Sequence, residues 1–136
     1  MGQQQLLLII LGVIVVGIAV AVGIAMFTDS AISANRDAVT NDLVNLASRA
    51  QQFYRRSKAM GGGGNSFVGL TADAAGLRKL TNNAISANGA YSIQTAGTST
   101  GLVIRGIGTE RADASNFVTM EINVFNDKAD SVVIIY

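Results

Sequence analysis

The sequence predicts an α+β fold in which a long N-terminal helix packs on a C-terminal four-stranded antiparallel sheet. Two observations carry this prediction. The first half of the chain lacks proline and has apolar residues at helical spacing, whereas the last third alternates apolar and polar residues between short polar turns. We divide the chain into an apolar helix at 1–27, its amphipathic continuation at 28–60, a glycine-rich connection at 61–88 and a sheet at 89–136.

The segment from Leu6 to Phe27 is apolar on every side of a helix. It has 22 residues and no charged side chain. As a helix it is about 33 Å long, which matches the hydrocarbon thickness of a bilayer. Because no polar stripe faces water, lipid or other protein chains must enclose it. Small residues along it permit close approach of a neighbouring helix, namely Gly12, Gly17, Ala19, Ala21, Gly23 and Ala25.

A single apolar stripe continues the helical pattern after Phe27. No glycine or proline interrupts 26–60, so we predict one helix of about 80 Å from about Gln4 to about Lys58. The stripe consists of Ile32, Val39, Leu43, Leu46, Ala50 and Phe53. We expect a helix–sheet core in which Val39, Leu46, Ala50 and Phe53 face Ile93, Ile104, Ile122 and Ile134.

The glycine run Gly61–Gly64 ends this helix. It lacks the lysine and hydroxyl residue of a phosphate-binding loop and follows a helix instead of a strand, so we interpret it as a flexible turn. A short helix capped near Thr71 or Asp73 is predicted next. Strands are predicted at 90–95, 101–105, 117–125 and 131–136. Short polar links between them favour an antiparallel meander, whose apolar face the amphipathic helix covers.

Composition argues against several classes of function. The net charge of +1 lacks the excess of basic residues that nucleic-acid binding needs. The chain has no histidine and no cysteine, which removes the commonest general base, the commonest metal ligand and any thiolate. The carboxylate groups near Glu110–Asp113 and Asp127–Asp130 lack the spacing of a calcium loop and are predicted to be solvated turn charges. We therefore expect no enzyme activity, no metal and no cofactor.

The order of these features resembles that of the type IV pilins and of the pseudopilins of type II secretion, most specifically from Gly2 to Phe27. The resemblance implies a subunit that the inner membrane holds by its apolar helix. Pilus assembly machinery then transfers the subunit into a homopolymeric helical filament at the cell surface. Gly2 occupies the place of the glycine before the prepilin cleavage site, which makes Gln3 the first mature residue.

Two departures from the family pattern predict a divergent member. Leu7 stands where the family usually has a glutamate, five residues into the mature chain, and the residues around Gly2 form no basic leader. In a filament of this kind we expect the contacts of the core helices to come from Leu7, Ile10, Ile14, Gly17, Ile18, Ala21, Gly23 and Phe27.

A second hypothesis shares the apolar helix but differs in function. The chain would be a single-pass membrane-anchored protein with a small extracytoplasmic binding domain. Such a protein does not need its anchor and its amphipathic helix to form one rigid rod. The charges at Asp29, Arg36 and Asp37 nearly cancel, so they do not set the orientation of the helix in a membrane.

Overall fold

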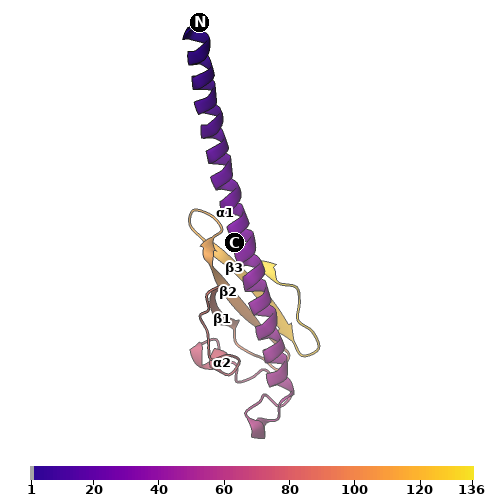
Figure 1. The fold of residues 1–136 in the computed structure, drawn as a ribbon. Coiled ribbons are helices and arrows are strands. Elements are labelled where there is room, and N and C mark those ends of the chain that lie inside the picture. Colours follow the sequence, from indigo (N-terminus) through magenta and orange to yellow (C-terminus); the bar gives the residue numbers. More distant parts are fainter. Residues whose placement is uncertain (1) are drawn as a thin grey trace.

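The structure, a computed structural model, describes residues 2–136 and confirms the predicted α+β architecture (Figure 1). The helix α1 spans Gly2–Arg55 without a break, including at Gly12, Gly17 and Gly23. Four antiparallel strands follow in the spatial order β1-β2-β3-β4. The elements after α1 are η1 (Lys58–Met60), α2 (Ala74–Arg78), β1 (Gly89–Thr95), β2 (Gly101–Arg111), β3 (Phe117–Phe125) and β4 (Val133–Ile134).

The C-terminal half of α1 packs on β2 and β3. We call this part of the molecule, residues 35–136, the head. The predicted core residues Val39, Leu46, Ala50 and Phe53 are all buried, between 0% and 7% exposed. They share one apolar cluster with Ile93, Ile104 and Ile122 of the sheet. The N-terminal half of α1 projects away from the head, and the C-terminus lies beside the middle of the helix (Figure 1).

Two glycines in β2 allow α1 to lie close to the sheet. A Cβ atom at Gly106 would press against Val39 and Tyr91, and one at Gly108 would overlap the side-chain oxygen of Asn35. The strand β2 extends to Arg111, beyond the predicted end at residue 105. Glycine is depleted in strands, so the sequence pattern places the end of the strand too early.

The glycine run closes the C-terminal end of α1. The helix ends at Arg55, three residues before the predicted end, because Ser57 adopts an extended conformation. The amide of Gly63 then donates to the carbonyl of Phe53 at 2.8 Å, and that of Asn65 donates to the carbonyl of Tyr54 at 2.7 Å. These bonds satisfy carbonyl groups that the helix leaves unpaired. The glycine run therefore ends the helix, as predicted, and it does so through these capping hydrogen bonds.

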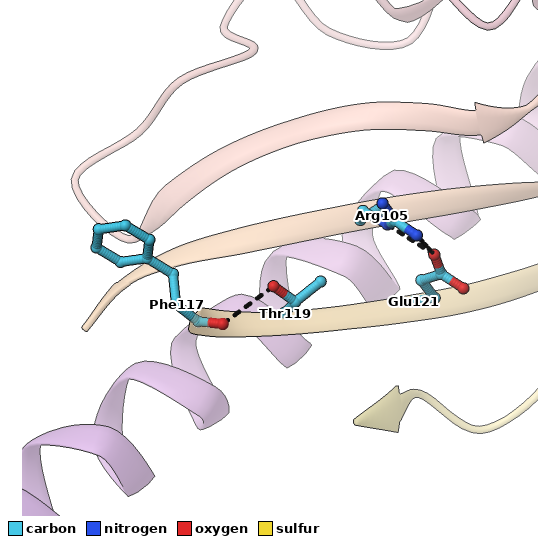
Figure 2. A network of polar contacts seen from close by, with 4 residues as sticks. All are labelled: Arg105, Phe117, Thr119 and Glu121. Carbon is cyan, nitrogen blue, oxygen red and sulfur yellow. Dashed lines mark hydrogen bonds and ion pairs between the residues drawn. The ribbon is translucent and has the colours of Figure 1, made fainter. Parts of the chain in front are cut away.

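The outer face of the sheet carries polar and charged side chains. Arg105 on β2 and Glu121 on β3 are direct cross-strand partners, and the guanidinium Nε and Nη2 atoms lie 2.7 and 2.6 Å from the same carboxylate oxygen (Figure 2). Nearby on β3, the hydroxyl group of Thr119 donates to the carbonyl of Phe117 at 3.0 Å. The face toward α1 is apolar, as predicted. The outer face is mixed, because Ile107 and Phe117 lie on it together with these polar side chains.

The prediction for Ile134 is wrong. It lies in register with Met120 at the edge of the sheet, but its side chain is 54% exposed because α1 covers β2 and β3 instead of β4. The strand itself is also shorter than the predicted 131–136. Beyond Ile134, the amides of Ile135 and Tyr136 both donate to the carbonyl of Thr119, which interrupts the regular ladder.

Candidate functional site

The N-terminal half of α1 is an apolar surface with no partner in the described part of the chain. We call residues Leu6–Phe27 the apolar rod. Its large side chains are between 52% and 77% exposed, with Ile10 and Val22 the least exposed and Phe27 the most. Monomeric soluble proteins rarely leave so large a continuous apolar surface in water. This surface is the strongest functional feature of the described residues.

The rod has the length and composition of a membrane-spanning segment. Within α1 an 18-residue window reaches a mean hydropathy of 3.2, and none of that window is buried inside the structure. This segment is therefore long and apolar enough to cross a bilayer. A helix that the head itself covered would show substantial burial in the same window.

Most of the predicted filament contacts share one face of the rod, and Gly23 and Phe27 lie on the opposite face. The side chains of Leu7, Ile14 and Ile18 are 67%, 53% and 61% exposed. Gly17 and Gly23 have no atom within 4 Å of an added Cβ, so nothing in the fold of the single chain requires glycine there. The full predicted set is exposed on α1 and comprises Leu7, Ile10, Ile14, Gly17, Ile18, Ala21, Gly23 and Phe27.

The residues of the predicted processing site lie at the start of α1. Gly2 is the first residue of the helix, and both Gly2 and Gln3 are exposed. The first turn of the helix contains no acidic residue. The apolar side chain of Leu7 follows one turn later and makes no polar contact.

A polar cluster in the head joins α1 to the segment before the sheet. Asp42 Oδ2 accepts hydrogen bonds from the Tyr91 hydroxyl at 2.5 Å, from Asn88 Nδ2 at 2.9 Å and from Ser86 Oγ at 3.4 Å. Burial alone would raise the pKa of Asp42, but the hydrogen bonds from Tyr91, Asn88 and Ser86 outweigh it and hold that pKa below its usual range. Burial and the contact with Asp42 raise the pKa of Tyr91.

Asn35 forms a second polar connection, about two helical turns closer to the rod. Its side chain is 9% exposed. Its Nδ2 atom donates to the carbonyl of Asn88 at 2.9 Å, and its Oδ1 atom accepts from the amide of Glu110 at 3.3 Å. A buried amide group needs such partners, so these bonds fix α1 relative to the loop before β1 and to the end of β2.

The helical and strand patterns predict neither polar connection. The sequence does contain a sign of Asn35. The apolar stripe has no apolar residue on the same helix face between Ile32 and Val39, and Asn35 occupies that position. For Asp42 no signal existed. Its partners Ser86, Asn88 and Tyr91 are far away in the sequence, and only the tertiary fold brings them to the helix.

An open hollow of about 230 Å³ lies beside this cluster. Its lining is mostly polar and comprises Asp42, Asn45, Leu46, Arg49, Thr81, Asn83, Ser86 and Tyr91. Arg49 also donates to the carbonyl of Leu80 at 3.2 Å, and this hydrogen bond stabilises the wall of the hollow. The donors and acceptors here already serve the fold, which favours a structural role for the cluster.

Two carboxylates of the sheet turns, Asp113 and Asp130, have local partners. Asp113 accepts from the amides of Ser115 and Asn116 at 2.8 and 2.9 Å and stabilises the β2–β3 loop. Asp130 lies 3.8 Å from the ammonium group of Lys128. Within residues 2–136 the structure shows no group of three or more side chains suited to hold a metal ion.

Acid stability tests the role of Asp42. Its pKa is lower in the folded chain than the ordinary value of 3.8, so its contribution to stability is present above that value and is lost as the pH falls through the folded-state pKa. At pH 7 we expect Asp42→Asn to cost about 1–3 kcal/mol, since the hydrogen bonds from Tyr91, Asn88 and Ser86 then end on a neutral amide group instead of a charged carboxylate. Thermal melts from pH 7 to 2 should show a weaker loss of stability below pH 4 in the variant than in the unmodified chain. An unchanged acid profile would contradict the role of Asp42.

Comparison with known proteins adds no assignment: no protein-family model, no curated protein and no solved structure matches this chain.

Proposed function

We propose that this chain is the structural subunit of an extracellular type IV pilus-like helical filament and that it polymerises through the apolar rod. One observation carries the proposal. The rod is exposed on all sides, yet it belongs to the same unbroken helix whose other half forms the core of the head. A membrane anchor requires only the exposed apolar surface. A filament subunit also uses the continuity of the helix, because a rigid helix fixes each head relative to the filament axis.

Two environments remove the rod from water at successive stages. In the inner membrane, lipid encloses it, since its length matches the hydrocarbon layer. In the filament, the rods of other copies take the place of lipid. Each large apolar side chain that leaves water contributes roughly 1.5–3 kcal/mol. The rod contains no charged residue, so neither environment must accommodate an unpaired ion.

Shape supports packing of the rod against copies of itself. Apolar helices in lipid gain no hydrophobic drive from contact with each other, so close packing through small residues becomes decisive. The open space at Gly12, Gly17 and Gly23 leaves these positions free for the side chains of a neighbouring helix. The partners of this chain are then its own copies, the inner membrane before assembly and a pilus assembly machinery. The proposal includes no nucleic-acid partner, no cofactor and no catalytic activity.

The polar hollow beside Asp42 favours a second candidate function, the membrane-anchored protein with a binding head. Asn45, Arg49 and Asn83 present donors and acceptors around it that a small polar ligand could contact. In that case the apolar rod remains in the membrane and each copy functions alone. The two candidates differ in what the rod contacts, and removal of the rod separates them.

A truncated chain that begins at Thr28 tests the proposed function. The core of the head lies entirely between Val39 and Val124, so we expect a folded, soluble monomer. The full-length protein should form filaments that sediment on ultracentrifugation, and the truncated chain should remain in the supernatant with the circular dichroism of a folded α+β protein. Filaments formed by the truncated chain would contradict the proposal, since assembly would then not depend on the rod.

A further inference from the structure

The junction between the apolar rod and the head carries two charged residues without a partner among the described residues. Asp29 and Arg36 lie on α1 and line the same hollow, together with Ile32, Ser33 and Ala112. Neither side chain takes part in a hydrogen bond or an ion pair within residues 2–136, and the Nε atom of Arg36 is buried with no partner there. The Nη atoms of Arg36 are not buried, and Asp29 is exposed, so both charges are accessible to a partner from outside the chain.

Helix geometry explains why Asp29 and Arg36 do not pair with each other. They are seven residues apart and therefore lie on the same face, but about 10.5 Å apart along the helix axis. The residues three and four positions away from each of them are uncharged, so no pairing within α1 is available either. Asp37 is adjacent to Arg36 in the sequence, but its side chain is exposed about 100° around the helix.

We infer that Asp29 of one copy pairs with Arg36 of a neighbouring copy and that this pair sets the axial register of the filament. The inference rests on the proposed function. When two parallel copies of α1 are shifted by about 10.5 Å along the axis, the carboxylate of one comes level with the guanidinium group of the other. The rods pack by shape, and residues 6–27 carry no polar or charged side chain that would add a preference for one shift. A charge pair directly beyond them selects one shift, as charged positions do in coiled coils.

Charge reversal in the full-length protein tests the pair. We expect Asp29→Arg alone and Arg36→Asp alone to reduce sedimentable filament about tenfold or more, since each places like charges opposite one another. The double variant with both reversals should recover filament to within about threefold of the unmodified protein. Asp37→Arg is the matched control, because it makes the same charge change one residue from Arg36 on a different face, and it should assemble normally.

Each alternative outcome overturns the inference. Normal assembly of the single variants, or a double variant no better than either of them, means that the pair does not set the register. Loss of the Arg36 variants from the membrane fraction before assembly would instead assign Arg36 to a lipid phosphate. Charge reversal could also disturb the fold of the head. In that case helical reconstruction of unmodified filaments tests the pair. It should show contacting helices with an axial shift near 10.5 Å and Asp29 within 4 Å of the neighbour's Arg36. Filaments with another shift refute the pair and leave the proposed function intact, whereas absence of filaments refutes both.

Discussion

Replacement of Ile14 by Asp should abolish filament assembly while the chain still inserts into the membrane. Ile14 lies near the middle of the apolar rod and is 53% exposed, so in a bundle of rods an aspartate here is buried against other copies. An unpaired buried carboxylate costs several kcal/mol, and the cost recurs in every subunit. Membrane insertion tolerates the same change. A central aspartate costs about 2.5–3.5 kcal/mol on the insertion scale, and the Leu, Ile and Val residues of the rod each contribute about −0.3 to −0.6 kcal/mol.

This difference makes Ile14→Asp informative about both candidate functions. The measurement compares the protein in the membrane fraction with the protein in sheared, sedimented filaments. Gln52→Asp is the control, because it adds the same charge to the same helix about 57 Å away, at an exposed position beside Arg49 and Arg56. Filaments that contain the Ile14→Asp chain in normal amount would contradict the burial of the rod between subunits.

The second large effect concerns the core of the head. Phe53 is 7% exposed and packs beside Gly63 and Gly69 of the connection that follows α1. We expect Phe53→Ala to lower the free energy of unfolding by about 3–5 kcal/mol, because the change removes a buried ring and leaves a cavity. In a domain of this size that corresponds to a fall of more than about 10 °C in Tm. Thermal melts of the truncated chain that begins at Thr28 measure it.

Phe117→Ala provides the comparison for this prediction. The same side chain is removed, but Phe117 is 42% exposed on the outer face of the sheet, and its ring has a single cation–π contact at 5.0 Å with Arg111. Its loss should cost no more than about 1 kcal/mol. Equal effects of the two substitutions would show that Phe53 is not a central part of the helix–sheet core.

The periodic features of the fold could be predicted from the sequence. The stripe from Val39 to Phe53 follows directly from helical spacing, and β3 follows from strict alternation, so both elements are where we expected them. The limits of β2 could not be predicted in the same way. Gly106 and Gly108 are read as turn residues unless it is known that α1 lies against them.

The sequence pattern also does not show which strands of the sheet the helix covers. Ile134 has the same apolar character as Ile122, but it lies at an edge that α1 does not reach, and its exposure depends on the placement of the helix over β2 and β3. The helix cap at Gly61–Gly64 is similar, since backbone amides form it and composition does not reveal their direction. The polar network around Asp42 depends on partners that only the fold brings together.

The apolar rod, by contrast, could be predicted from the composition of the sequence alone. Its exposure in the structure follows from the size of the head, which is too small to enclose a helix of this length. Lipid covers this surface before assembly in the proposed function, and other copies of the rod cover it in the final state.

Electron microscopy of the purified full-length protein tests this point most directly. Our account predicts helical filaments in which the apolar rods of many copies form the axis and the heads form the outer surface, with α1 of each copy continuous from core to surface. A preparation that contains single chains embedded in membrane or detergent, and no filaments under any condition of assembly, would contradict it and favour the membrane-anchored binding protein.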